Sequence, residues 1–142
     1  MQVLDSITLP AHLAHLQTFV NFVTSCSRGQ GFNQKKIHEI ELAAEEALVN
    51  IFTYAYEEEI GDVEIICKID NDERFILEII DTGVPFNVLS VKDPDISADI
   101  SERHIGGLGV FLMKNLMDAV HYRREGDKNI LNLIVLKHTK HF

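Results

Sequence analysis

The chain has 142 residues, and its 13 Lys and Arg against 22 Asp and Glu give a formal net charge of −9. The length suits one domain spanning residues 1–142, and 46% hydrophobic with 25% charged residues is typical of a globular protein rather than a disordered one. No apolar run approaches the roughly 18 residues of a membrane-spanning helix. The acidic balance argues against a protein that coats nucleic acid, because phosphate binding requires clustered Lys and Arg.

The N-terminus and the cysteines indicate a cellular location. The first five residues, Met-Gln-Val-Leu-Asp, contain neither a basic region nor an apolar core, so we expect no secretion signal. Cys26 and Cys67 are far apart and lack CxxC spacing, so we expect neither a disulfide framework nor a structural zinc site. We therefore expect a protein of the reducing cytoplasm.

The first half of the chain predicts one strand followed by two helices. Residues 3–9 mix β-branched and polar residues and predict an edge strand that ends at Pro10. Residues 11–27 have helical spacing, and the glycines that follow end this helix. A second helix is expected to begin near Asn33, a good N-cap residue, and to run to about Tyr56. The apolar residues with this spacing in the first helix are Leu13, Leu16, Val20 and Val23, and the expected core face of the second helix is Ile37, Ile40, Ala44, Ala47, Leu48, Ile51 and Ala55.

The second half predicts a mainly antiparallel sheet with a third helix. Strands are expected at 63–69, 75–80, 119–125 and 129–137, with turns at 71–73 and 126–127 and a helix opened by glycines at 106–117. Between Asp81 and Ile105 no regular element is predicted, and so long a stretch is typical of a lid or a binding loop. Helices on one face of such a sheet make an α+β, two-layer sandwich.

Glu46 and Asn50 lie four residues apart on the second predicted helix. That spacing puts their side chains about 40° apart and one turn above the other, beside the apolar stripe. An amide oxygen is a suitable ligand for a hard cation such as Mg²⁺, and a neighbouring carboxylate is a suitable base. The same spacing is also common between a solvated Glu and a surface Asn, and the pair alone leaves both interpretations open.

Asp81 ends an apolar strand and is followed by Thr82 and Gly83. A carboxylate at the end of a strand accepts hydrogen bonds from a ligand amine, and glycine lets a ligand approach the backbone. Ordinary turn chemistry accounts for the same three residues.

Gly106-Gly107-Leu108-Gly109 opens the third predicted helix. Glycines at a helix N-terminus expose N–H groups where the helix dipole favours an anion such as phosphate. No GxxxxGK[ST] sequence occurs, so this is not a P-loop, and a lone glycine cluster is a weak signal.

Together, in this order, the three motifs resemble the N, G1 and G2 boxes of the GHKL ATPase superfamily. The segments 46–56, 81–86 and 106–112 are most similar to those of the bacterial anti-sigma factor serine kinases, and the resemblance extends through the C-terminal segments 116–124 and 126–131. It implies a Bergerat-type ATP-binding fold, in which three helices cover one face of the sheet. Tyr54 and Asn87 depart from the residues common in that family, which bears on partner specificity more than on ATP binding.

The resemblance implies a role for each motif. Asp81 would accept a hydrogen bond from the adenine amino group, with Gly83 giving room beside the base. Asn50 would ligate Mg²⁺ that bridges the phosphates of ATP. Glu46 would be the general base that activates the attacking hydroxyl.

For the glycine motif, the resemblance implies phosphate binding. Gly106, Gly107, Leu108 and Gly109 would bring backbone N–H groups to the phosphates, and the loop from about Val88 to Ile105 would close as a lid.

The resemblance also implies partners. The acceptor would be a serine of a STAS-type anti-sigma factor antagonist, and the same small homodimer would sequester a sigma factor, without direct contact to nucleic acid or membrane. Two other functions remain open at this point: an ATP-binding regulatory module that switches protein partners without phosphorylating them, and an ATPase that uses water.

Overall fold

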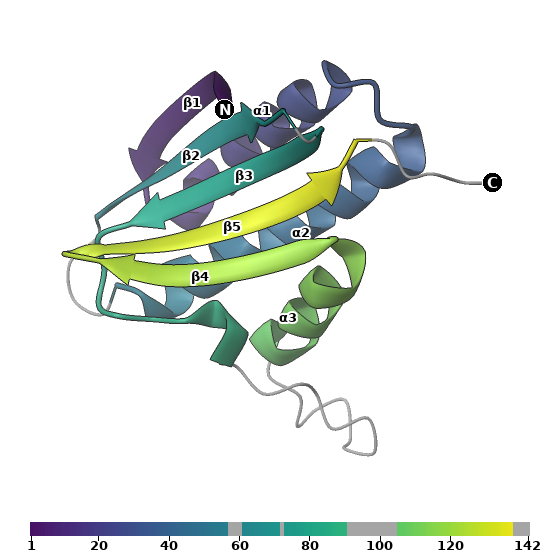
Figure 1. The fold of residues 1–142 in the computed structure, drawn as a ribbon. Coiled ribbons are helices and arrows are strands. Elements are labelled where there is room, and N and C mark those ends of the chain that lie inside the picture. The colour runs from purple at the N-terminus through teal and green to yellow at the C-terminus, as the bar shows by residue number, and fades with distance from the viewer. Residues whose placement is uncertain (57–60, 72, 91–104, 138–142) are drawn as a thin grey trace.

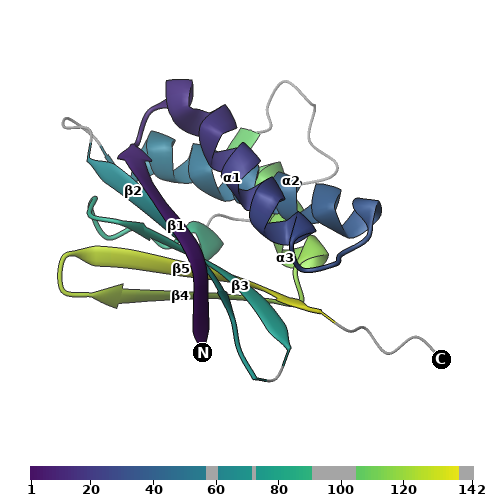
Figure 2. The same ribbon diagram turned by 90° about the horizontal axis from the view of Figure 1, so that it is seen from above.

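The computed structural model describes residues 1–56, 61–71, 73–90 and 105–137. These residues form an α+β, two-layer sandwich, in which an antiparallel sheet is covered on one face by three α-helices (Figures 1 and 2). The strands are β1 (Gln2–Pro10), β2 (Asp62–Ile69), β3 (Arg74–Asp81), β4 (Ala119–Glu125) and β5 (Lys128–Leu136), and the helices are α1 (Leu16–Arg28), α2 (Gln34–Tyr54) and α3 (Ile105–Leu116). The predicted fold class is confirmed.

The sheet has the strand order β1-β2-β3-β5-β4, and each neighbouring pair is antiparallel. β1 is an edge strand, as its composition predicts. The predicted strand boundaries agree with the observed ones to within one residue. The turn between β4 and β5 contains Gly126 at a φ of 58°, which glycine adopts without strain. Of the predicted turn at 71–73, residue 72 lies outside the described residues.

The core lies between α2 and the inner face of the sheet. Alternate residues of β2 and β3 point toward the helices, and Ile65, Leu77 and Ile79 are at most 1% exposed. All seven core positions predicted for the second helix are buried. The helix begins after Asn33, whose side-chain Oδ1 accepts a hydrogen bond from the Lys36 N–H at 2.8 Å, so the predicted N-cap is also confirmed.

The first helix differs from the prediction. Residues 13–15 form a separate 3-10 turn, and α1 begins only at Leu16. The imidazole Nδ1 of His12 accepts the Ala14 N–H at 2.9 Å, a local hydrogen bond that competes with an α-helical start. Leu13 therefore lies outside α1 and is 62% exposed, and Phe19 and Val23 carry the buried face of α1.

The connection after β3 also differs in one respect. A short 3-10 helix, Val88–Ser90, occupies part of the segment that was expected to lack regular structure. Asn87 caps it by accepting the Leu89 N–H at 2.9 Å. Residues 91–104, which make up most of the predicted lid, lie outside the described residues. Within the parts of the chain that are described, no helix is both long enough and apolar enough to span a membrane.

Candidate active site

The second half of α2 brings Glu46 and Asn50 together at the edge of the core. Asn50 is only 1% exposed, and its Nδ2 donates a hydrogen bond to the Glu46 carbonyl at 2.7 Å. The other amide atom, Asn50 Oδ1, and the carboxylate Oε2 of Glu46 are both buried without a hydrogen-bond partner among the residues that the structure describes. Because an unpaired buried oxygen costs free energy, two of them on side chains one helical turn apart indicate a place built for a ligand.

The start of α3 closes against this pair. α3 packs on α2, and Gly109, in the second turn of α3, is buried beside the Glu46 carboxylate. A Cβ atom at Gly109 would overlap Oε2 and Cδ of Glu46. Glycine is therefore required for this close approach of helix backbone to carboxylate. Gly106, Gly107 and Leu108 lie in the first turn of the same helix, as predicted.

The environment of Glu46 raises the pKa of its carboxyl group above the ordinary value. Burial raises the pKa of the Glu46 carboxyl, and the negative charge of Glu45 raises it further. A carboxylate with a raised pKa holds a proton more readily than an exposed one, which suits a group that accepts a proton during a reaction.

A second cluster forms around Asp81 at the end of β3. Asp81 is 2% exposed, and its Oδ1 accepts hydrogen bonds from the Gly83 N–H at 2.9 Å and from Asn129 Nδ2 at 2.8 Å. Its other oxygen, Oδ2, has no hydrogen-bond partner among the described residues. Burial raises the pKa of Asp81, while the hydrogen bonds from Asn129 and Gly83 and the charge of Arg124 oppose that shift.

Gly83 joins this second cluster to the end of α2. The Val84 N–H donates to the Ala55 carbonyl at 2.8 Å, where Ala55 caps α2 one turn beyond Ile51. A Cβ at Gly83 would overlap the Ala55 carbonyl. Glycine is therefore required at position 83 by this backbone contact, independently of any space that it leaves for a ligand. Thus Glu46 and Asn50 lie on the last turns of α2, and the segment that follows Asp81 contacts the C-terminal cap of the same helix.

Asn129 also belongs to the Asp81 cluster, although the sequence did not identify it as a site residue. It is 3% exposed, and it holds Asp81 in place while its Nδ2 also donates to the Val84 carbonyl at 2.8 Å. Its Oδ1 accepts from the Phe86 N–H at 3.1 Å and from the Tyr122 hydroxyl at 2.6 Å. The available signal was an amide at the start of an apolar strand, directly opposite Asp81 in the register of β3 and β5.

Arg124 was also missed. Its Nη1 donates to the Gly83 carbonyl at 2.9 Å, so β4 contributes a cation to the Asp81 cluster. Tyr54, one of the departures from the family pattern, is 43% exposed and contacts the ring of Phe86 with centroids 5.4 Å apart. The two aromatic rings lie between the end of α2 and the segment after Asp81.

The oxygens of Asn50 and Glu46 suit a hard cation such as Mg²⁺ only if a bound ligand supplies further oxygen ligands. Within the described residues there is no group of three or more His, Cys, Asp or Glu side chains placed to hold a metal ion. The unpaired Oδ1 of Asn50 is the kind of oxygen that Mg²⁺ binds, and Mg²⁺ takes few protein ligands when substrate phosphates complete its shell. The residues present therefore fit a magnesium–nucleotide complex better than a metal ion alone.

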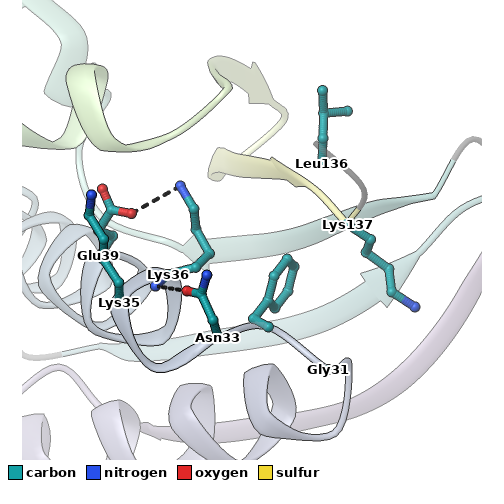
Figure 3. Close-up of a pocket in the computed structure, with 8 residues that line it drawn as sticks. Gly31, Asn33, Lys35, Lys36, Glu39, Leu136 and Lys137 are labelled. Carbon is teal, nitrogen blue, oxygen red and sulfur yellow. Dashed lines mark hydrogen bonds and ion pairs between the residues drawn. The ribbon is translucent and has the colours of Figure 1, made fainter. Parts of the chain in front are cut away.

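A cavity of about 440 Å³ lies elsewhere, between the start of α2 and the end of β5 (Figure 3). Lys35, Lys36 and Lys137 line it, and Lys36 forms an ion pair with Glu39 at 3.2 Å. Twelve residues of helix, or about 18 Å at 1.5 Å per residue, separate the start of α2 from Glu46. This cavity is not part of the candidate site.

Comparison with known proteins agrees with the fold and the motifs. The family described as "Histidine kinase-like ATPase domain" matches residues 9–135. The protein named Serine-protein kinase RsbW from Bacillus mycoides (strain KBAB4) is 25% identical over 127 residues, which cover 87% of this chain and 79% of the relative.

Two proteins with the same name from Bacillus cereus align over the same shares of both chains. They are 28% identical in strain Q1 and 26% identical in strain B4264. The family resemblance inferred from the three motifs is thereby confirmed. The chain belongs to the histidine kinase-like ATPase domain family.

Proposed function

We propose that this chain is an ATP- and Mg²⁺-dependent protein serine kinase that also acts as an anti-sigma factor. The observation that carries the proposal is the pair of buried, unpartnered oxygens of Glu46 and Asn50 next to the start of α3. The similarity to proteins named Serine-protein kinase RsbW supports the reaction class. A site that only sensed ATP would need no carboxylate buried beside the phosphate end of the nucleotide.

The adenine end of ATP would bind at the Asp81 cluster. Asp81 Oδ1 is already used by Gly83 and Asn129, which leaves Oδ2 to accept a hydrogen bond from the adenine amino group. Asn129 and Arg124 hold the carboxylate and the Gly83 backbone in position, so the acceptor would be oriented before the base arrives. Gly83 would lie beside the base.

The phosphates would lie between α2 and α3. The N–H groups of Gly106 and Gly107, in the first turn of α3, would donate to phosphate oxygens, aided by the positive end of the helix dipole, and Leu108 and Gly109 would bring the helix backbone close to the phosphates. Asn50 Oδ1 would ligate Mg²⁺, which would neutralise phosphate charge. In this way a chain with a net charge of −9 would hold a polyanion through backbone donors and one cation, without a basic patch.

Glu46 would act as the general base. As the acceptor serine oxygen forms its bond to the γ-phosphorus, the bond from that phosphorus to the β–γ bridging oxygen breaks and ADP leaves. The serine proton passes to Glu46, whose raised pKa makes it a ready acceptor. Phosphoryl transfer depends mainly on positioning and charge neutralisation, and these residues would supply both.

The proposed partners follow from the same family resemblance. The acceptor would be a serine of a STAS-type anti-sigma factor antagonist, and the chain would sequester a sigma factor as a homodimer in the cytoplasm. The charge of −9 supports regulation through proteins rather than through direct contact with nucleic acid.

The deciding experiment combines the purified chain with ATP labelled at the γ-phosphate and the STAS-type antagonist from the same cell. The expected result is label on a serine of the antagonist, abolished by EDTA and by replacing that serine with alanine. Tight ATP binding without transfer would instead identify a module that only switches partners. Release of free phosphate in the absence of any protein acceptor would identify an ATPase that uses water. Either outcome would overturn the kinase proposal.

A further inference from the structure

The two cysteines of the chain, distant in sequence, are neighbours in the fold. Cys26 lies in the last turns of α1, and Cys67 lies near the end of β2. α1 packs over β1 and β2, as Figure 2 shows, and the Cys26 side chain packs on the core cluster to which Cys67 belongs. Asp5 lies opposite Cys67 in the register of β1 and β2 and lines the same cavity as Cys26, so the two cysteines lie close together, and both are free. Their separation of 41 positions in the sequence, without CxxC spacing, does not predict this proximity.

The two thiols differ in access to solvent. Cys67 is fully buried, whereas Cys26 is partly exposed. Cys26 also borders a cavity of about 240 Å³ between β1 and α1, which Leu4, Asp5 and Phe22 help to line. A small polar oxidant entering this cavity meets Cys26, whereas Cys67 is buried and does not line the cavity.

The two thiols also differ in proton affinity. The hydrogen bond from Cys67 lowers the pKa of Cys26, against the opposing effects of burial and of the Asp5 carboxylate. The same contact and burial raise the pKa of Cys67. Since the thiolate is the nucleophilic form, Cys26 is the one of the two that reacts first.

We propose that Cys26 and Cys67 form a reversible disulfide when the protein meets a peroxide, which fastens α1 to the sheet. The Cys26 sulfur attacks one oxygen of hydrogen peroxide, the O–O bond breaks, and one water leaves with the thiol proton, giving a sulfenic acid. The Cys67 sulfur then attacks the Cys26 sulfur, the S–O bond breaks, and the hydroxyl leaves as a second water with the Cys67 proton. Two thiols and one peroxide thus give one disulfide and two waters.

The cross-link would have a consequence for the whole fold. It closes a loop over residues 26–67, which contains all of α2 with Glu46 and Asn50. Closing a loop of this length restricts the unfolded chain and stabilises the folded one. Neither cysteine belongs to the proposed ATP site, so the disulfide can be tested independently of the proposed kinase activity.

The test uses the full-length chain, reduced with dithiothreitol, desalted and exposed to hydrogen peroxide in slight molar excess. Free thiols are counted, the intact mass is measured, and thermal unfolding is followed by circular dichroism. We expect both thiols to disappear, a mass loss of two hydrogens in the monomer, and a rise in Tm of about 5 °C or more, all reversed by dithiothreitol.

Two single variants separate the roles of the thiols. Cys67→Ala leaves Cys26 without a resolving partner, so dimedone should trap its sulfenic acid, more slowly than the wild-type chain forms its disulfide because Cys67 no longer lowers the pKa of Cys26. Cys26→Ser should slow the oxidation of the remaining thiol at least about tenfold, because Cys67 is buried. The wild-type measurements stand even if one variant fails to fold. The proposal is overturned if wild-type protein keeps both thiols at a peroxide concentration that oxidises Cys67→Ala, or forms only disulfides between chains.

Discussion

Gly109 lies directly against the carboxylate of Glu46, closely enough that any side chain at Gly109 would occupy the place of Glu46 Oε2. This contact joins α2 and α3, and hence two motifs that are far apart in the sequence. The position of the proposed base therefore depends on the absence of a side chain on another helix.

Gly109→Ala tests this dependence. In an unconstrained helix the substitution would be stabilising by about 1 kcal/mol, because alanine favours the helical conformation. Here the new methyl group must push the Glu46 carboxylate away from Asn50, and a displacement of about 1 Å at a reacting group costs on the order of 100-fold in rate. We expect a folded protein that binds ATP and transfers phosphate on the order of 100-fold more slowly in single-turnover assays.

A matched control for this variant is Gly29→Ala at the end of α1, where a Cβ would meet no atom closer than 3.5 Å. It should transfer phosphate at the wild-type rate. A Gly109→Ala protein as active as this control would mean that Glu46 is not held in place for catalysis.

Asp81→Asn tests the proposed adenine contact. The variant keeps Oδ1 as the acceptor for Gly83 and Asn129 but replaces the free Oδ2 by an amide donor, which would face the adenine amino group donor to donor. The loss of one buried hydrogen bond costs about 1–3 kcal/mol, or about 5- to 150-fold in Kd. Isothermal titration with ATP should show that weakening, while Asp127→Asn on the exposed turn should not.

The raised pKa of Asp81 has a consequence for stability in the absence of nucleotide and metal. The folded chain holds the proton of this carboxyl more tightly than the unfolded chain does, so its contribution to stability is present below the ordinary pKa and is lost as pH rises through the raised value. Asp81→Asn has no such titration.

The difference in Tm, Asp81→Asn minus wild type, should therefore grow as pH is raised from about 4, near the ordinary pKa of Asp, to about 7. Differential scanning calorimetry measures it. A difference that stays constant over this range would contradict the pKa shift.

Asn129→Ala tests the hydrogen-bond network that Asn129 forms with Asp81, Phe86 and Tyr122. The substitution leaves the Tyr122 hydroxyl and the Phe86 N–H without their acceptor and removes a donor from Asp81, which should destabilise the fold by about 2–3 kcal/mol. Tyr122→Phe breaks only one of these hydrogen bonds and should cost about 1 kcal/mol. Urea denaturation of both proteins gives the order of the two losses. If Tyr122→Phe were as destabilising as Asn129→Ala, the network would not be centred on Asn129.

The sequence alone predicts the structure correctly where the spacing of apolar residues within one helix or strand determines it, or where a hydrogen bond between residues close in the sequence does. The helical stripe from Ile37 to Ala55 and the alternation of Val63, Ile65 and Cys67 predict their buried faces correctly, because each pattern is produced by the geometry of a single element. Asn33 was identified as an N-cap for the same reason.

The errors and omissions have physical causes that lie outside such patterns. The spacing of Leu13 fits the helix, but the hydrogen bond of His12 to Ala14 ends the regular helix before it reaches Leu13. The contact between Gly109 and Glu46, the pairing of Asn129 with Asp81 and the meeting of Cys26 with Cys67 each join separate elements. Only the packing of helices on the sheet brings these residues together.

The most direct test of the proposed mechanism is single-turnover transfer from labelled ATP to the antagonist serine by wild-type and Glu46→Gln protein. The variant keeps the size and shape of the side chain but replaces one carboxylate oxygen by an amide group and removes the base, so it should bind ATP with close to wild-type affinity and transfer phosphate about 10²- to 10⁴-fold more slowly. Glu45→Gln, on the exposed side of the same helix, is the matched control and should remain active. Transfer by Glu46→Gln at the wild-type rate would contradict the assignment of Glu46 as the base.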